Sequence, residues 1–393
     1  MGAMASPTHS DAVVVVGGGI IGMAIAWSAA RAGLDVTVVD PAPGRGATWA
    51  AAGMLAPVAE AQFGELALAA LNQAAVRAWP GFAARLESAS GQPVHFRPDG
   101  TLLVAGDPSD RAATERVLAF HRTVGLAAGR LGARACREAE PLLAPGISGG
   151  ADLPDDHQVD NRATAMALLA ACRNAGASFV PDEVDRVEVA DGRTQGVVLA
   201  GGGRLGARAV VVAAGSRSGD LRGLPDDVRP PVRPVRGVTV RLQAPDGVPR
   251  LRRTVRALLH GRTCYLVPRD DGGLVVGATM EERGTDRSVP LGGLVDLLDD
   301  ARRVVPALDE YTVVETTSGL RPGSPDNGPL VGATATEGLV VATGHFRNGI
   351  LLAPLTADDV VTTLLGHGTD DGPFAAFRPG RFEAVPPATG RRS

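Results

Sequence analysis

The chain has 393 residues, of which 45% are hydrophobic and 21% are charged, and its formal net charge is −4. These proportions are typical of globular proteins and exclude a wholly disordered, collagen-like or coiled-coil chain. The length predicts two or three domains, the charge gives no reason to expect nucleic acid as a partner, and no apolar run is long enough to cross a bilayer.

All 39 basic residues are arginine, because the sequence contains no lysine. A Walker-type phosphate loop and a pyridoxal phosphate Schiff base each need a lysine, so both are excluded. The three cysteines, Cys136, Cys172 and Cys264, are an odd number at wide spacing. This pattern predicts neither a disulfide framework nor a zinc site, and it favours the reducing cytoplasm as the compartment.

The first predicted elements in chain order form a strand–helix–strand unit. A β-branched run at 13–16 predicts a buried strand, a glycine turn follows at 17–22, and a helix is expected over 20–31. A second strand at 36–39 ends in Asp40. A strand, a glycine turn, a helix and an acid at this spacing predict a dinucleotide-binding domain.

The glycine turn fits the pattern Gly-x-Gly-x-x-Gly with Gly17, Gly19 and Gly22. A side chain on either of the first two glycines would hold the backbone away from a pyrophosphate, and the third lets the helix lie against the strand. The N–H groups of residues 19–21 are expected to face the phosphates at the positive end of the helix. Asp40 is placed to accept hydrogen bonds from an adenosine ribose.

Helical and extended patterns alternate through the rest of the chain. Apolar residues at helical spacing predict helices over 65–87, 108–128 and 162–175. Predicted strands lie at 93–104, near 179, and at 184–189, 195–199, 210–215, 265–268 and 274–277. A strand at 338–341 and a helix over 350–365 repeat the strand–turn–helix order, and residues 382–393 are predicted to form a flexible tail.

Six sequence blocks, in order along the chain, resemble one known family. They are residues 17–22, 50–57, 265–269, 277–280, 319–322 and 344–354. Together they are similar to FAD-dependent glycine oxidase, the thiamine-pathway member of the D-amino-acid and sarcosine oxidase superfamily. The resemblance implies an α/β fold with a Rossmann-like FAD-binding domain and an interleaved substrate domain of mixed β-sheet plus helices. The implied FAD domain comprises 11–60, 150–220 and 316–366, and the substrate domain comprises 61–149 and 221–315.

The resemblance also implies which residues bind FAD. Around the phosphates, adenosine and flavin they are Gly17, Gly19, Ile20, Ile21, Gly22, Asp40, Pro41, Ala47, Thr48, Ala52, Gly53, Met54 and Val184. The loop implied to surround the flavin ring consists of Gly344, His345, Phe346, Arg347, Asn348, Gly349, Ile350 and Leu351. Reduced flavin carries negative charge, which the positive end of the helix expected near Gly349 would stabilise. FAD is expected to be noncovalent, because Gly-Ser-Pro stands at 323–325, where some related oxidases carry a cysteine.

For the substrate, the resemblance implies that Arg321 grips an amino acid carboxylate by two parallel hydrogen bonds. Tyr265 would add a phenolic hydrogen bond with Arg347 nearby, and Met54 and Met280 would fill the pocket wall. Three alternatives stay open: Arg321 in a surface ion pair, Tyr265 as an ordinary strand aromatic, and Arg347 as a brace for the flavin loop. The expected reaction oxidises glycine, sarcosine or a small D-amino acid to the imine or 2-oxo acid and ammonia, and dioxygen becomes hydrogen peroxide.

Two other functions remain open at this point. One is a dehydrogenase of D-amino acids or N-methylglycines that passes electrons to a carrier other than oxygen, and the other is a flavin-bearing binding protein without turnover. Related enzymes use a lysine to activate dioxygen, so here an arginine, His345 or the bound product must supply the positive charge. The resemblance also names thiazole synthase as a candidate partner and a homotetramer as the expected assembly.

Overall fold

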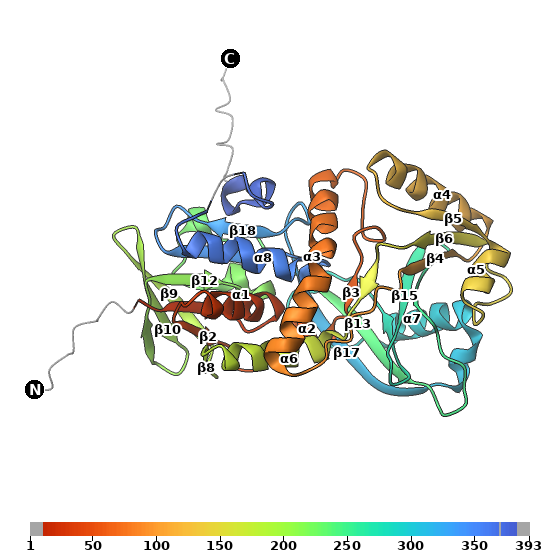
Figure 1. Ribbon diagram of the computed structural model, residues 1–393, viewed down its shortest axis with the longest axis horizontal. Coiled ribbons are helices and arrows are strands. Elements are labelled where there is room, and N and C mark those ends of the chain that lie inside the picture. The colour runs from red at the N-terminus through yellow and green to blue at the C-terminus, as the bar shows by residue number, and fades with distance from the viewer. Residues whose placement is uncertain (1–10, 369–370, 383–393) are drawn as a thin grey trace, which may run out of the picture.

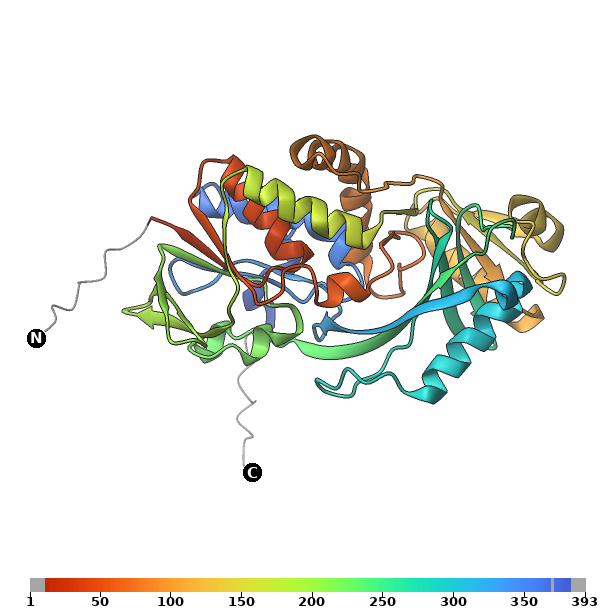
Figure 2. The ribbon, with the colours of Figure 1, turned by 90° about the horizontal axis from the view of Figure 1, so that it is seen from below.

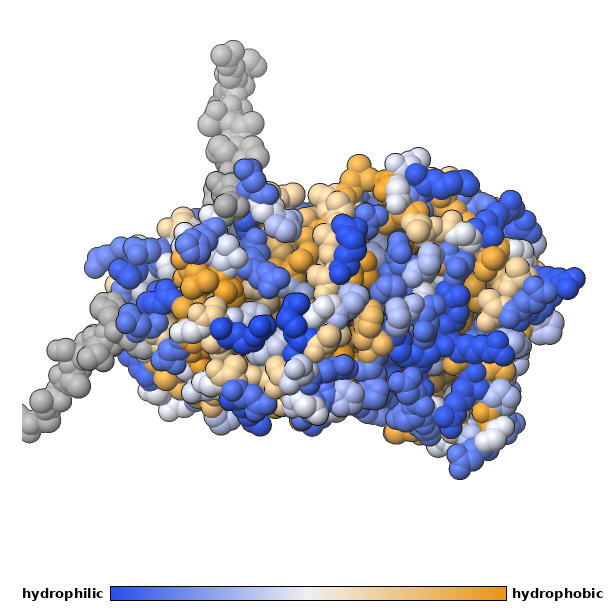
Figure 3. Space-filling model, viewed as in Figure 1, coloured by the Kyte–Doolittle hydropathy of each residue, from blue (hydrophilic) through white to orange (hydrophobic). Residues whose placement is uncertain are grey.

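The computed structural model describes residues 11–368 and 371–382 (Figure 1). Two large sheets lie side by side along the longest axis of the molecule (Figures 1 and 2). The predicted tail at 382–393 lies outside the described residues, apart from Phe382. On the face shown in Figure 3, hydrophilic residues surround separate apolar patches, as expected of a globular chain. None of the described helices is long and apolar enough to cross a membrane.

The first sheet has six strands in the order β18-β19-β12-β1-β2-β8, all parallel except β18. Both of its faces are covered, and all four valines of β1 are therefore buried. Its strands are β1 (Val13–Val16), β2 (Val36–Val39), β8 (Ser178–Val180), β12 (Ala209–Val212), β18 (Leu330–Ala333) and β19 (Leu339–Thr343).

Helices cover one face of this sheet, and a small sheet covers the other (Figures 1 and 2). The helices are α1 (Ile20–Arg31), α3 (Leu66–Ser90), α6 (Asn161–Asn174) and α8 (Gly349–Leu364). The small antiparallel sheet consists of β9 (Val184–Ala190), β10 (Arg193–Leu199) and β11 (Arg204–Gly206). Apolar side chains of alternate residues in β1 therefore enter two different cores.

The second sheet has eight strands in the order β17-β13-β16-β15-β14-β4-β6-β5, and only the β14–β4 pair is parallel. Its strands are β4 (Thr101–Ala105), β5 (Gly129–Gly132), β6 (Gly149–Leu153), β13 (Arg233–Gln243), β14 (Thr254–Leu259), β15 (Arg262–Pro268), β16 (Gly273–Gly277) and β17 (Thr312–Gly323). Besides several short 3-10 helices, the other elements are α2 (Ala47–Ala50), α4 (Pro108–Thr123), α5 (Ala133–Ala139), α7 (Leu291–Val304) and the short pair β3 (Met54–Leu55) and β7 (His157–Gln158).

The predicted α/β fold class is confirmed, and so are the bounds of β1, α1 and β2. The helix expected over 108–128 is too long, because it ends at Thr123, just before Gly125 with a φ of +71°. The strand expected over 93–104 begins only at Thr101, after two prolines that lack an N–H group for a sheet. Helix α7, which packs apolar residues against the second sheet, was not predicted.

Candidate cofactor and substrate site

A cavity of about 640 Å³ connects the two sheets. Val16 and Val39, the last residues of β1 and β2, line it, and so do Ala213 beyond β12 and Thr343 at the end of β19. The cavity therefore opens at the carboxyl ends of four parallel strands, where α/β sheets generally bind ligands. Its volume is within the usual range for a cofactor or small-molecule site.

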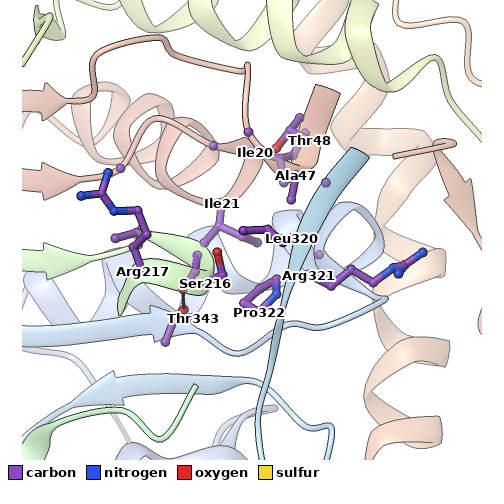
Figure 4. A pocket seen from close by; sticks show the side chains of 18 of the residues that line it. Ile20, Ile21, Ala47, Thr48, Ser216, Arg217, Leu320, Arg321, Pro322 and Thr343 are labelled. Atoms are coloured by element: carbon purple, nitrogen blue, oxygen red, sulfur yellow. Dashed lines mark hydrogen bonds between the residues drawn. The ribbon is translucent and has the colours of Figure 1, made fainter. Parts of the chain in front are cut away.

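Most of the residues predicted to form the site line this one cavity. They are Gly17, Gly19, Ile20, Ile21, Asp40, Pro41, Ala47, Thr48, Ala52, Gly53, Met54, Val184, Tyr265, Arg321, His345, Phe346, Arg347, Gly349 and Ile350. Figure 4 shows Arg217 and Arg321 at opposite ends of the pocket, with Ile21 and Leu320 between them. Segments that are far apart in the sequence thus meet around a single elongated space.

Four predicted residues lie behind the cavity wall: Gly22, Gly344, Asn348 and Leu351. A Cβ at Gly22 would lie 1.9 Å from the carbonyl oxygen of Gly17, so this glycine lets α1 pack on the turn. Leu351 is buried in the core, and its carbonyl oxygen accepts a hydrogen bond of 2.9 Å from the indole of Trp79. Met280 was expected to fill the pocket wall, and this prediction is wrong, because Met280 is 62% exposed and does not line the cavity.

Backbone and side-chain hydrogen bonds hold the glycine turn. Gly17 has a φ of +104°, and a Cβ there would lie 2.5 Å from the carbonyl oxygen of Ala213. The two carboxylate oxygens of Asp40 accept hydrogen bonds of 2.7 Å from the N–H groups of Gly18 and Ala42. Asp40 therefore stabilises the turn while it faces the cavity, and its contact with a ribose stays a prediction.

Helix α1 begins at the cavity wall opposite α2. The N–H of Ile20 donates to Thr48 Oγ1 at 3.0 Å, so Thr48 takes one of the free N–H groups of the first helical turn. The lining between α2 and β3 consists of small residues, including Ala51, Ala52 and Gly53. Small residues leave the backbone accessible along this wall, which is what an extended dinucleotide requires. These residues therefore fit an FAD molecule.

At the other end of the cavity, two strand glycines make room for Tyr265 and Arg321. A Cβ at Gly277 of β16 would lie 2.2 Å from the ring carbon Cζ of Tyr265. A Cβ at Gly237 of β13 would lie 2.2 Å from Arg321 Nη1. Each long side chain thus lies flat across a neighbouring strand and reaches the cavity.

Arg321 forms ion pairs with no carboxylate in the part of the chain that the structure describes. Its Nη1 donates to the backbone carbonyl oxygens of Thr279 at 3.1 Å and of Arg236 at 3.4 Å. The alternative of a surface ion pair is therefore contradicted. Burial raises the pKa of Tyr265, although the Arg321 charge acts in the opposite direction, so the phenol keeps its proton at neutral pH. The site thus presents a cation and a neutral O–H donor side by side.

Glu60, which the sequence reading missed, also lines the cavity. Its carboxylate pairs with Arg256, and its Oε2 lies 2.8 Å from Arg347 Nε. Burial alone would raise the pKa of Glu60, but the charges of Arg256 and Arg347 outweigh it and lower the pKa. Glu60 lies in a loop between β3 and α3 without a recognisable motif, so no local signal distinguished it from a surface glutamate.

Asp156 holds the loop that carries Glu60. The carboxylate of Asp156 accepts hydrogen bonds from the N–H groups of Val58 at 2.8 Å and Ala59 at 3.1 Å. Burial raises the pKa of Asp156 to about 7, and these hydrogen bonds offset the effect only in part. The loop therefore depends on a carboxyl group that titrates near neutral pH.

We expect Asp156 to make stability depend on pH. Between pH 4 and pH 7, roughly, folded protein keeps a proton on Asp156 that the unfolded chain has lost, so this carboxyl makes the free energy of unfolding fall as the pH rises. The free energy of unfolding of wild type, minus that of Asp156→Asn, should therefore decline by up to about 1.4 kcal/mol for each pH unit in this range. Above pH 7 this difference should become constant. Urea unfolding of the two FAD-loaded proteins at pH 5, 6, 7 and 8 measures this difference. If the free energies of unfolding of the two proteins changed in parallel with pH, the raised pKa of Asp156 would be contradicted.

His345 lies in the loop that leads into α8. Its Nε2 lies 3.0 Å from Thr356 Oγ1, and burial lowers the pKa of the imidazole to about 3. His345 is therefore uncharged at neutral pH and cannot supply a positive charge for the reaction with dioxygen. None of the three cysteines lines the cavity, and all three are buried.

The chain matches a family model described as FAD dependent oxidoreductase over residues 12–362. It is 34% identical over 370 residues to the bifunctional protein ThiO/ThiG of Nostoc sp. (strain PCC 7120 / SAG 25.82 / UTEX 2576), which covers 91% of this chain and 53% of that protein. The crystal structure of glycine oxidase from Geobacillus kaustophilus matches with a TM-score of 0.85 and 33% identity, covering 95% of this chain and 99% of that one. The crystal structure of iminodiacetate oxidase from Chelativorans sp. BNC1 matches with a TM-score of 0.82 and 25% identity, covering 93% and 98%.

The chain spans about half the length of the bifunctional relatives that it matches. Its similarity to glycine oxidase extends over nearly the whole length of both chains, which confirms the resemblance predicted from the sequence blocks. The family match includes the glycine turn, β17 and the helix after His345, all of which contribute to the cavity wall. A chain that matches this family over residues 12–362 and forms a cofactor-sized cavity at the ends of its parallel strands belongs to the family of FAD-dependent oxidoreductases.

Proposed function

We propose that this enzyme oxidises small amino acids that carry one carboxylate and a primary or secondary amine, with glycine and sarcosine as the first candidates. The observation that carries the proposal is Arg321, a cation in the cavity wall that pairs with no carboxylate among the described residues. A guanidinium group in that setting suits a substrate carboxylate, because it offers two parallel N–H donors. The relatives named glycine oxidase support the same substrate class.

In this proposal the residues of the chain bind and orient the substrate. Arg321 and the protonated Oη of Tyr265 hold the carboxylate, and this fixes the direction of the Cα–H bond. FAD, when bound, accepts the hydride and transfers the electrons to dioxygen. The amine reacts in its neutral form, so no side-chain base is needed. The released imine hydrolyses in water to the 2-oxo acid and ammonia where the amine is primary, or to the 2-oxo acid and methylamine where the substrate is sarcosine.

The loop before α8 stabilises negative charge in the proposed site. Helix α8 begins at Gly349, and Gly349 and Ile350 line the cavity. The positive end of a helix and its free N–H groups favour an anion at this position. Noncovalent attachment of FAD is supported by the cysteines, because none of them lines the cavity.

Several finer expectations belong to the same proposal. They are the division into an FAD domain and a substrate domain, reaction with dioxygen, a homotetramer, a cytoplasmic location and thiazole synthase as a partner. The partner is supported by relatives whose name joins ThiO and ThiG in one chain. Because burial leaves His345 uncharged, the positive charge for the reaction with dioxygen would come from an arginine, and Arg321 and Arg347 line the substrate end of the cavity.

The experiment that tests this function is anaerobic reduction of the purified holoprotein. Glycine, sarcosine, D-alanine and D-proline are mixed with it in turn, and the loss of visible flavin absorbance is followed. We expect glycine or sarcosine to reduce the flavin fastest, because Arg321 suits a single carboxylate and several relatives are named glycine oxidase. A yellow protein that none of the four amines reduces would contradict the proposal.

The same samples separate an oxidase from a dehydrogenase. After anaerobic reduction, air is admitted and hydrogen peroxide is measured against the amine consumed. One peroxide for each amine supports the oxidase. Rapid reduction with little peroxide and slow reoxidation would favour a dehydrogenase that uses another electron acceptor.

A further inference from the structure

Glu60 is a buried carboxylate at the substrate end of the cavity to which the proposed function gives no role. Its side chain is 9% exposed, and it lines the cavity together with Tyr265, Arg321 and Arg347. Its Oε2 lies close to Arg347 but makes no hydrogen bond of good geometry with any described group. A buried carboxylate oxygen without a hydrogen bond costs free energy, so its retention beside a substrate site needs an explanation.

The contacts of Glu60 show what it does to the charge of the cavity. It lies between Arg256 and Arg347, whose side chains are 15% and 16% exposed, and it is the carboxylate partner that the described residues provide for both. The side-chain oxygen of Gln62, in the amide orientation that satisfies both groups, accepts from Arg347 Nη1 at 2.9 Å and Nη2 at 2.8 Å. The two Nη atoms of Arg347 are therefore occupied by Gln62 and its Nε lies against Glu60, whereas Arg321 forms an ion pair with no carboxylate among the described residues.

This arrangement distinguishes Arg321 from the two arginines that contact Glu60. Arg321 is open to a carboxylate, and Arg256 and Arg347 are compensated by Glu60. A substrate that placed a second carboxylate near Glu60 would meet Arg347, which already shares that anion with Arg256. Like charges brought together in a partly desolvated site discriminate strongly between ligands.

Resting on the proposed function, we propose that Glu60 is the specificity-determining residue that restricts this site to amines with a single carboxylate. It compensates the two arginines that would otherwise bind a second anionic group, and its own charge repels such a group. Removing the charge of Glu60 leaves Arg347 at the cavity wall without its anionic partner, and Arg256 adds a second uncompensated positive charge beside the same residue. The substrate class of this chain is then set by one acid in a loop, while Arg321 sets the requirement for a first carboxylate.

The test compares wild type with Glu60→Gln, which keeps the size of the side chain and removes its charge. Sarcosine carries a methyl group on its nitrogen where iminodiacetate carries a carboxymethyl group. The ratio of their kcat/KM values therefore reports on how the site treats the second carboxylate. We expect Glu60→Gln to shift this ratio toward iminodiacetate by about tenfold or more. The matched control is Glu315→Gln, because Glu315 pairs with Arg162 outside the cavity, and it should leave the ratio unchanged.

A binding measurement keeps the inference falsifiable if the variant has low activity or if the proposed function is wrong. Methoxyacetate and diglycolate resemble the same two amines but have no nitrogen to oxidise, and calorimetry on the holoprotein gives both dissociation constants. Wild type should bind methoxyacetate at least about tenfold more tightly than diglycolate, and Glu60→Gln should narrow that gap. The role of Glu60 would be overturned if wild type bound methoxyacetate and diglycolate equally tightly. It would also be overturned if the ratio of the two dissociation constants in Glu60→Gln stayed within twofold of the wild-type ratio. Failure of every amine to reduce the flavin would refute the proposed function instead.

Discussion

Replacing Arg321 by alanine is expected to lower kcat/KM for glycine or sarcosine by roughly 10² to 10⁴-fold while the protein keeps its FAD, because two hydrogen bonds to a charged group are lost. The structural effect should be small, since Arg321 forms no ion pair with a carboxylate among the described residues and its contacts are two backbone carbonyl oxygens and the Tyr265 phenol. Steady-state kinetics and the visible flavin spectrum of the purified variant measure the two quantities. The decisive feature is loss of turnover without loss of cofactor.

Two further variants make this result specific. Arg321→Lys keeps the charge but not the planar fork, so its activity should fall between those of wild type and Arg321→Ala. Arg134→Ala removes an exposed arginine that pairs with Glu138 and should leave the kinetics unchanged. If Arg321→Ala were purified without FAD or unfolded, Arg321 would be a structural residue and the substrate assignment would fail.

Gly22→Ala is expected to have the largest effect on folding and cofactor content. A Cβ there would lie 1.9 Å from the carbonyl oxygen and 3.1 Å from the carbonyl carbon of Gly17. Because these atoms belong to the backbone of the turn, α1 would have to move away from β1. We expect the thermal midpoint to fall by about 5 °C or more and the FAD content of the purified protein to fall with it.

The matched substitution is Gly292→Ala in α7, where an added Cβ would meet nothing within 4 Å. It should leave the FAD content unchanged and stabilise the helix by at most about 1 kcal/mol, since glycine is a poor helix former. Thermal unfolding followed by flavin fluorescence and by circular dichroism compares the two variants. A Gly22→Ala protein with wild-type stability and FAD content would show that the close approach of α1 to the turn is unnecessary.

Local patterns were enough to predict the first elements that line the cavity. The valine run at 13–16, the glycine turn and the helix stop at Gly33 act over a few residues each, and the structure has β1, α1 and β2 at the predicted positions. The end of α4 was misjudged because the apolar spacing continued past Gly125, whose positive φ ends the helix. Periodicity indicates the type of an element better than it indicates where the element ends.

The substrate end of the site depended on contacts that no local pattern contains. Glu60 is 196 residues from Arg256 and meets it only after β14 and the loop before α3 fold together. Gly237 and Gly277 could be noted as glycines inside strands, but the side chains that lie across them belong to β17 and β15. Sequence alone could not show which arginine would be paired and which would be open.

The sequence by itself determined the family, the fold class, the dinucleotide turn and the absence of lysine chemistry, because these follow from residue types and short spacings. Tertiary structure decided the charge state and pairing of the site: an uncharged His345, an open Arg321, and a Glu60 shared by Arg256 and Arg347. The physical reason is that burial and electrostatic pairing depend on neighbours in space, and those neighbours come from strands and loops far apart along the chain.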